Sequence, residues 1–167
     1  LARPSGRWVG QHLRGAEWIG VNSSWLAARI HARGVPKLNI IATHPAVDDR
    51  EVVTTETGRS EAMIISVARL VSRKNIKIVL QAIPILLPEF PHLQYHVIGD
   101  GPERQHLQAL AAQLRITNHV VWHGQTSDAD RRALLRRAMV FVLVPTIRQS
   151  GADIEGLGAV FLEAAAA

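Results

Sequence analysis

The feature that most constrains this chain is an alternation, from residue 63 onward, between short apolar runs and segments of helical periodicity. The apolar runs are rich in β-branched residues and predict strands at residues 63–68, 93–98, 119–122 and 139–144. The spacing of apolar residues predicts a helix after each strand, the last one beginning at about Ala159. Short connections favour parallel crossover units, so we expect an α/β fold with a Rossmann-like, doubly wound parallel sheet and helices on both faces.

Three details of this pattern concern single elements. Pro84 falls inside the first helical period and should kink that helix or end it early, because proline lacks an N–H and crowds the preceding turn. Ser127 or Asp128 is expected to cap the third helix. The apolar run at residues 138–144 is far shorter than the ~18 residues of a membrane span and predicts a buried strand.

The first 60 residues carry a different pattern. They predict a strand at residues 16–22, a helix capped by Ser23 or Ser24 that reaches about Ala32, and a strand at residues 38–42. One helix and two short strands bury little apolar surface alone, so we interpret residues 1–43 as the tail of a preceding domain. Residues 44–60 predict an interdomain linker, and residues 61–167 predict a Rossmann-like domain, incomplete at its C-terminus.

Composition excludes several classes of protein. The 167 residues contain no cysteine, which removes disulfide scaffolds, thiol nucleophiles and cysteine-based metal sites. The net charge is +5, and four arginines cluster on one predicted helix: Arg131, Arg132, Arg136 and Arg137. No aromatic residues interleave with them, so we interpret the cluster as a solvated helix face and not as a nucleic-acid surface. The chain begins at Leu1 and ends in alanines, and we expect it to be a piece of a longer protein.

Two cations follow the first predicted strand. Arg69 and Lys74 lie within one short loop at its carboxyl end, where doubly wound sheets bind their ligands. This pair suits a diphosphate, because arginine donates as a planar fork and lysine acts as a point charge. Taken alone, such a pair is more often two exposed loop charges.

The second predicted strand is followed by the turn at residues 99–101, which reads Gly-Asp-Gly. Arg104 stands where a dinucleotide fingerprint has its third glycine or alanine, which argues against a standard NAD site. The turn itself leaves two interpretations open: a tight turn with a helix cap, or a close backbone approach to a nucleotide.

The loop before the last helix combines glycines with carboxylates. Gly156 and Gly158 free the backbone, so N–H groups at the start of the helix can face an anion. Glu155 precedes this helix and Glu163 lies inside it among apolar residues. A buried carboxylate needs partners. Sugar or ribose hydroxyls would provide them, and so would a helix cap and a salt bridge.

Other catalytic patterns are missing from the sequence. His119 and His123 are four residues apart but fall on a predicted strand and its end, so they do not share a helix face as a metal-binding pair would. We therefore expect no metal site. The sequence also has no G-x-S-x-G nucleophile elbow.

Taken together, these motifs resemble those of a known family. Residues 67–70 with Lys74, residues 99–103, and the pair Glu155 and Glu163 are similar to the donor-binding domain of the GT-B, family 4 retaining glycosyltransferases. The resemblance covers about residues 16–167 and is strongest from residue 63 on. Residues 151–158 are most similar to the phosphatidylinositol mannosyltransferase-like members, which use GDP-mannose.

The resemblance implies a role for each of these residues. Arg69, Lys74 and Glu155 would be catalytic, the two cations by holding the donor diphosphate and Glu155 by binding hydroxyls of the donor sugar. Glu163 would bind the ribose. The other donor-binding positions that it implies are Gly99, Gly101, Gly124, Gly156, Leu157 and Gly158. Because fixed cations can stabilise the charge that develops on the leaving diphosphate, the resemblance implies no metal and no cofactor.

The sequence departs from the family at three positions. Ala68 and Asn75 stand where glycine is usual, and Leu157 where phenylalanine is frequent. Asparagine accepts a positive φ comparatively well, so Asn75 is tolerable.

A family member needs about twice this length, and we expect this chain alone not to transfer sugar.

The resemblance also implies partners and a location. The partners would be a nucleotide-sugar donor and a lipid-linked or carbohydrate acceptor, with no nucleic acid. The location would be the cytoplasm, with peripheral association at the inner face of the membrane. The alternative is a non-catalytic α/β module that binds a nucleotide or phosphate.

Overall fold

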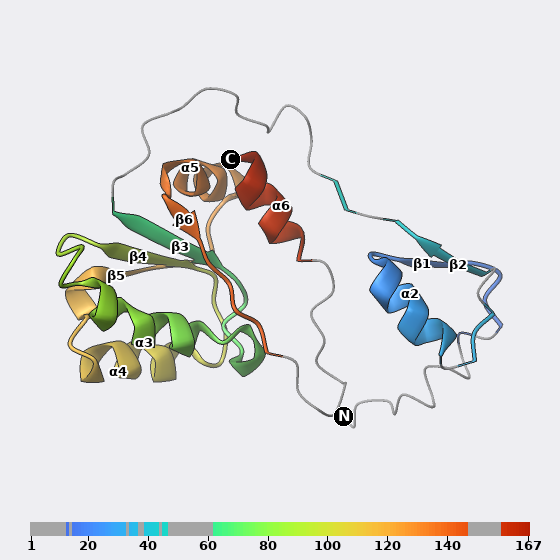
Figure 1. Ribbon diagram of the computed structural model, residues 1–167, viewed down its shortest axis with the longest axis horizontal. Helices are drawn as coiled ribbons and strands as arrows, with labels where there is room; N and C mark the ends of the chain where they lie inside the picture. The colour runs from blue at the N-terminus through green and yellow to red at the C-terminus, as the bar shows by residue number, and fades with distance from the viewer. Residues whose placement is uncertain are drawn as a thin grey trace. The chain divides into compact units, whose positions relative to one another are not determined.

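The computed structural model describes residues 13, 15–32, 34–36, 39–43, 45–46, 62–146 and 158–167 (Figure 1). The chain divides into two compact units, one of Leu1–Ala46 with Gln149–Ala159 and one of Val47–Arg148 with Val160–Ala167, and each is described by itself. The predicted division into residues 1–43, 44–60 and 61–167 stays a prediction.

The smaller unit pairs two parallel strands beside one helix. It contains β1 (Ile19–Val21), α2 (Ser24–His31) and β2 (Ile40–Ala42). The side chain of Ser23 caps α2 by accepting a hydrogen bond from the Leu26 N–H at 3.2 Å. The strand, helix and strand expected here are confirmed, although both strands are shorter than the apolar runs that predicted them.

The larger unit is a four-stranded parallel sheet with helices in every crossover. Its elements, in chain order, are β3 (Met63–Val67), η3 (Ser72–Lys74), α3 (Ile76–Leu86), β4 (Gln94–Ile98), α4 (Arg104–Gln113), η4 (Thr117–His119), β5 (Val120–Gly124), α5 (Asp128–Arg137), β6 (Val140–Phe141) and α6 (Ala159–Ala166). The strand order is β5-β4-β3-β6, and every neighbouring pair is parallel. The predicted parallel α/β sheet is therefore confirmed.

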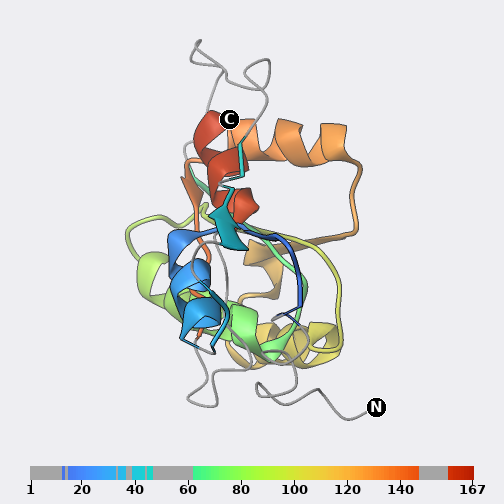
Figure 2. The ribbon, with the colours of Figure 1, turned by 90° about the vertical axis from the view of Figure 1, so that its right-hand side faces the viewer.

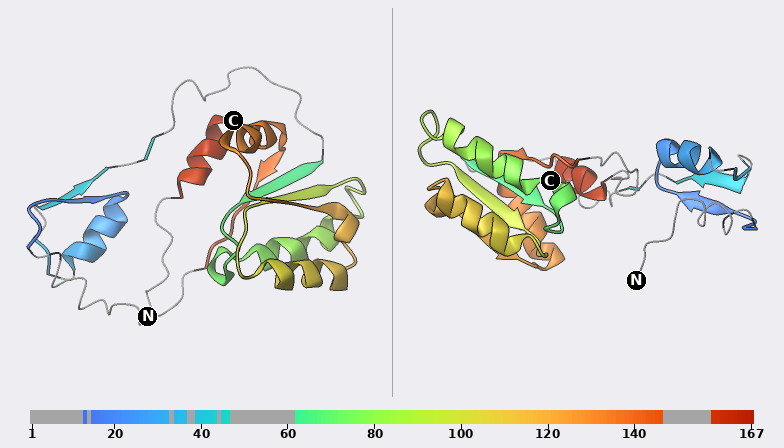
Figure 3. Two further views of the ribbon diagram at one scale, coloured as in Figure 1. Left: turned by 180° about the vertical axis from the view of Figure 1, so that it is seen from behind. Right: turned by 90° about the horizontal axis from the view of Figure 1, so that it is seen from below.

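Helices cover both faces of this sheet, as Figures 2 and 3 show. On one face α3 and α4 lie side by side over a core that includes Leu80, Tyr95 and Leu107. On the other face α5 and α6 enclose a second core around Ile65 and Leu135. The arrangement is doubly wound because the chain passes from one face to the other between β5 and β6.

Of the two outcomes expected for Pro84, an early end of the helix is wrong, and a kink stays a prediction. Pro84 lies inside α3, which continues to Leu86, and the Leu87 N–H still bonds the Ile83 carbonyl at 3.2 Å. Only the last turn of the helix carries the proline, so one missing N–H removes one hydrogen bond near an end that frays anyway. The buried face of α3, with Val79, Leu80 and Ile83, holds the rest of the helix against the sheet.

The last strand is shorter and more exposed than predicted. Only Val140 and Phe141 form β6, against Ile64 and Ile65 of β3. Val140 is 45% exposed. The apolar content of residues 139–144 predicted a full strand, but β6 has a described neighbour only on its β3 side, and an apolar run does not by itself show how many strands flank it.

A chain of buried hydroxyls joins three strands where the strand order reverses. The Tyr95 hydroxyl donates to Ser66 Oγ at 2.8 Å, and the Ser66 hydroxyl donates to the Val142 carbonyl just after β6. Burial raises the pKa of the Tyr95 phenol, so it remains a donor at any ordinary pH. The carboxyl end of β3 is thereby tied to both of its neighbours.

Replacing Ser66 should destabilise the fold, because Ser66 is the middle member of these hydrogen-bonded hydroxyls. In Ser66→Ala the Tyr95 hydroxyl loses its acceptor while still buried, and we expect a loss of about 1–3 kcal/mol in the free energy of unfolding, measured by urea titration. Tyr95→Phe should cost less, because Ser66 still donates to Val142. The Ser66→Ala/Tyr95→Phe double variant should recover part of the Ser66→Ala loss, and strict additivity of the two single effects would contradict the coupling.

Candidate functional site

The predicted site residues fall into two groups. Arg69, Lys74, Gly158 and Glu163 are described, as are the three glycines of the strand ends: Gly99, Gly101 and Gly124. Glu155, Gly156 and Leu157 lie outside the described residues, so their predicted roles stay predictions. Arg69 and Lys74 follow β3, and Gly99 and Gly101 follow β4. Gly124 is the last residue of β5, Gly158 precedes α6, and Glu163 lies within α6.

The loop after β3 presents the two predicted phosphate-binding cations differently. Arg69 is exposed, whereas Lys74 closes η3 and is only 8% exposed. Asn75 follows with φ of 57°, between η3 and α3. A left-handed residue is required at this turn, which explains why asparagine can stand where glycine is usual.

Glycines in the turn after β4 let that turn pack against the loop after β3. Gly99 has φ of +123°, and a Cβ at Gly99 or Gly101 would overlap the carbonyl oxygen of Ala68 or Leu70, respectively. The Leu70 N–H donates to the Asp100 carbonyl at 2.9 Å, and Leu70 accepts from the Glu103 N–H at 3.1 Å. The close approach that these glycines allow is therefore to the neighbouring loop of the same chain.

The turn after β5 joins the same edge. Gly124 has φ of +67°, and its carbonyl accepts the Gly99 N–H at 2.7 Å. Asp100 accepts from Arg104 Nη1 at 3.1 Å, which fixes the start of α4 to the turn. After β6, the Thr146 N–H donates to the Arg73 carbonyl at 2.8 Å. The carboxyl ends of all four strands of the larger unit are thus linked by hydrogen bonds between loops.

Glu163 is held by an arginine from the predicted basic cluster. Arg131 Nε donates to Glu163 Oε2 at 3.0 Å, and Arg131 Nη1 donates to Asp128 Oδ1 at 2.8 Å. Ser127, and not Asp128, caps α5 by accepting from the Asp130 N–H at 3.1 Å. The salt bridge that was open as an alternative for Glu163 is present. Arg131 therefore connects α5 to α6 and is not simply a solvated charge.

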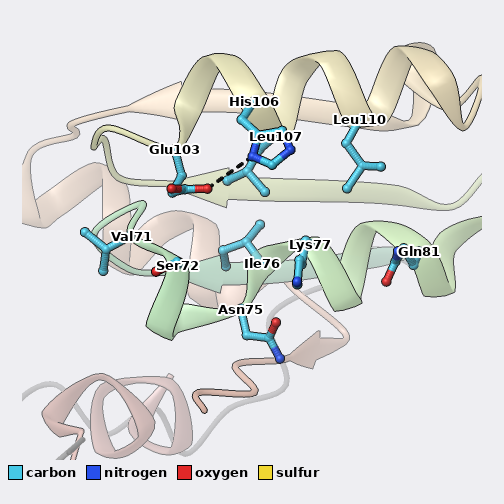
Figure 4. Close-up of a pocket in the computed structure, with 10 residues that line it drawn as sticks. All are labelled: Val71, Ser72, Asn75, Ile76, Lys77, Gln81, Glu103, His106, Leu107 and Leu110. Carbon is cyan, nitrogen blue, oxygen red and sulfur yellow. Dashed lines mark hydrogen bonds and ion pairs between the residues drawn. The ribbon is translucent and has the colours of Figure 1, made fainter. Parts of the chain in front are cut away.

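A groove of about 410 Å³ runs between α3 and α4 (Figure 4). Its apolar floor contains Ile76, Leu107 and Leu110. A hydrogen bond of 3.3 Å between Glu103 Oε2 and His106 Nδ1 lies on one side. None of the described site residues predicted from the sequence lines it. The groove is separate from the predicted donor-binding positions.

The structure also brings together two histidines that the sequence did not pair. His96 Nδ1 of β4 and His123 Nε2 of β5 are 2.9 Å apart and share a hydrogen bond. Burial, together with the nearby His123 and Arg137, lowers the pKa of His96 to about 4, and burial lowers the pKa of His123. His119, paired with His123 by spacing alone, instead bonds the Leu93 carbonyl at 3.0 Å. Regular register pairs His96 with Val121, and a shift of one residue after Trp122 brings His123 beside His96, so neither helical spacing nor regular strand pairing indicates the pair.

The described part of the chain contains neither a cluster of three metal-binding side chains nor a membrane-spanning helix. No group of three or more histidine, aspartate or glutamate side chains that could hold a metal ion occurs in the described part of the chain. Within the same part, none of the helices is both long enough and apolar enough to cross a membrane.

Comparison with known families decides the membership of the chain. The family model described as glycosyl transferases group 1 matches residues 49–167, which include every predicted site residue. The chain belongs to the group 1 glycosyltransferases. The match extends through the loops after β3, β4 and β5 and through α6.

Curated relatives of this group 1 glycosyltransferase include enzymes of different donor specificity. A GDP-mannose-dependent alpha-(1-6)-phosphatidylinositol monomannoside mannosyltransferase of Mycolicibacterium smegmatis is 34% identical over 62% of this chain and 27% of its own length. Its counterpart from Mycobacterium tuberculosis is 27% identical over 92% of this chain and 42% of its own length. A lipopolysaccharide 1,6-galactosyltransferase of Salmonella typhimurium is 29% identical over 63% of this chain and 29% of its own length. The chain spans less than half the length of these relatives.

Solved structures confirm the GT-B glycosyltransferase fold. The pneumococcal O-GlcNAc transferase GtfA, in complex with UDP and GlcNAc, superposes with a TM-score of 0.77 at 17% identity, over 95% of this chain and 31% of its own. Anabaena HepE, in complex with UDP and glucose, gives a TM-score of 0.76 at 17% identity, over 93% of this chain and 44% of its own. At this identity the likeness establishes the fold.

Adding one methyl group at the turn after β4 should test the contact between the two loops. We expect Gly99→Ala to lower the free energy of unfolding by more than about 2 kcal/mol, because it combines a strained φ with overlap on Ala68. Gly20→Ala is the matched control, since a Cβ at Gly20 meets nothing within 4 Å. Equal losses for the two variants in urea titrations would contradict the packing argument.

The histidine pair should make stability fall in mild acid. The folded state keeps His96 neutral down to pH about 4, while the unfolded chain takes up this proton below its ordinary pKa of about 6.5. Stability from the neutral pair is therefore full above pH 6.5 and lost as the pH falls toward 4. Melting temperatures in a chelator-containing buffer should fall less steeply between pH 7 and pH 4.5 for His96→Asn than for the parent. The exposed-residue control His92→Asn should follow the parent.

Proposed function

We propose that the chain is the donor-binding part of a retaining glycosyltransferase, which moves a hexose from a nucleoside diphosphate sugar to an acceptor. Family membership supports the reaction class. The observation that carries the proposal is the linked carboxyl edge of the sheet, where Arg69 and Lys74 precede α3 beside the strand-order reversal between β3 and β6. In doubly wound sheets, ligands bind at such a reversal.

The proposed chemistry uses fixed positive charge. Cleavage of the bond between the sugar and the diphosphate leaves negative charge on the departing nucleotide, and preorganised cations stabilise that charge in the transition state. Lys74 is nearly buried, so its side chain loses little freedom on binding and its charge is weakly screened. Arg69 is exposed and can close on the diphosphate as a planar fork. We propose that these two cations neutralise the diphosphate and that transfer requires no metal.

Glu163 can serve the donor while it remains bound to Arg131. The arginine occupies Oε2, and an ionised carboxylate accepts hydrogen bonds at both oxygens. The second oxygen of the carboxylate can accept a hydrogen bond from a ribose hydroxyl. We propose this ribose contact for Glu163, and sugar hydroxyl contacts for Glu155.

Mannose from GDP-mannose is the first choice of donor. Two of the relatives named above are GDP-mannose-dependent, and this supports the choice. The solved neighbours carry UDP, so the shared fold accommodates more than one base. The acceptor, lipid-linked or carbohydrate, and a cytoplasmic location with peripheral association at the inner membrane face stay predictions. So does the inactivity of this chain alone.

Charge removal at the β3 loop tests the proposal. In the full-length protein, Arg69→Ala and Lys74→Ala should each weaken binding of GDP or GDP-mannose roughly tenfold to a hundredfold, as expected for a lost hydrogen bond to a charged group. Lys77→Ala is the control, because Lys77 is an exposed lysine that lines the groove between α3 and α4. Isothermal titration with GDP, UDP and their sugars gives the affinities.

Two results would contradict parts of the proposal. Unchanged affinity in the Arg69→Ala/Lys74→Ala double variant would remove these residues from the donor site. Donor binding by the full-length protein without product, across lipid-linked and carbohydrate acceptors, would favour the non-catalytic nucleotide-binding module.

A further inference from the structure

The histidine pair lies on the face of the sheet opposite α3 and α4. Tyr95 and Val97 of β4 point into the core beneath α3 and α4, so His96 between them points to the other face. In β5 the register shifts by one residue: Val97 pairs with Trp122 and Ile98 with Gly124. His123 is therefore the extra residue of a β-bulge, a feature that re-aims a side chain.

The bulge brings two ring nitrogens to the separation found in metal complexes. His96 Nδ1 and His123 Nε2 are 2.9 Å apart, with ring centroids 5.0 Å apart. Imidazole nitrogens bind zinc at about 2.0–2.1 Å, so two of them on one ion are about 2.9–3.4 Å apart for bond angles between 90° and the tetrahedral value. A small rotation of the two rings would therefore make room for a metal ion bound to both nitrogens.

We propose that His96 and His123 form a binding site for a divalent transition-metal ion that prefers imidazole, such as zinc or copper. The ion takes the place of the proton between the two nitrogens. The histidine that donated this proton changes to its other neutral tautomer and carries the proton on its second ring nitrogen. Water fills the remaining positions of the ion. Both side chains are partly exposed, so water and ions can reach them. Nitrogen ligands favour such ions over magnesium or calcium, which prefer oxygen.

The surroundings of the pair set its strength. Arg137 of α5 acts electrostatically on His96, and its positive charge weakens cation binding. Two protein ligands beside an arginine therefore predict an affinity well below that of four-ligand structural zinc sites.

Binding would have a local structural effect that is separate from sugar transfer. His123 immediately precedes Gly124, whose carbonyl bonds the Gly99 N–H at 2.7 Å. An ion bridging His96 and His123 links β4 to β5 beside this bond. Because the ion binds the folded pair and not the separated strands, it stabilises the folded chain.

Titration of the full chain with zinc chloride and with copper chloride at pH 7.5 tests the site. We expect binding of one ion per chain, a raised melting temperature, and at least a tenfold loss of affinity in both His96→Gln and His123→Asn. The matched control His92→Ala should bind like the parent. Arg137→Gln should bind more tightly, and magnesium chloride should neither bind nor stabilise.

A spectroscopic measurement keeps the test independent of how well the variants fold. In the unmodified chain labelled with nitrogen-15, zinc should shift the side-chain nitrogen resonances of His96 and His123 and leave that of His92 unchanged. Zinc affinity unchanged in both histidine variants, shifts confined to other histidines, or no binding up to about millimolar metal would each overturn the proposal.

Discussion

The carboxyl edge of the sheet depends on one close contact between the loop after β3 and the turn after β4. In this contact, carbonyl oxygens of the loop occupy the space that a side chain on the turn would need. Gly99 and Gly101 permit this approach to Ala68 and Leu70, and hydrogen bonds through Leu70 hold the segments in place. The loop bearing Arg69 and Lys74 therefore has little backbone freedom. Its cations are positioned by glycines of the turn after β4, 25 to 32 residues later in the sequence.

This constraint connects stability to the proposed chemistry. A transition-state charge is stabilised best by groups that need no reorganisation when the reaction occurs. Backbone contacts hold the loops together, and the ion pair of Arg131 with Glu163 ties α6 to α5. The groups proposed to bind the donor are therefore held in place before it binds. Substitutions that loosen these contacts are expected to impair donor binding without touching the donor.

The sequence predicted the architecture well because period and length are strong signals. Residues 63–67 and 94–98 are strands within one residue of their apolar runs, and Ser23 caps its helix as expected. The prediction was weaker where neighbours decide the outcome. Of residues 139–144, only Val140 and Phe141 form a strand. The sequence places Arg131 on a solvated helix face because its partner Glu163 lies 32 residues away. The pair of His96 and His123 depends on a bulge, which shifts cross-strand register in a way that no helical spacing rule detects.

The hydroxyl chain from Tyr95 through Ser66 to Val142 bears on the order in which the sheet assembles. A strand as short as β6 contains few backbone bonds to specify its alignment with β3. A slip of one residue would move the Val142 carbonyl away and leave a buried hydroxyl without its acceptor, so Ser66 selects one alignment among several. The two residues are 76 positions apart in the sequence, and closing a loop of that length costs chain entropy. We therefore expect β3 and β4 to pair early, with β6 docking last against a partner that has already formed.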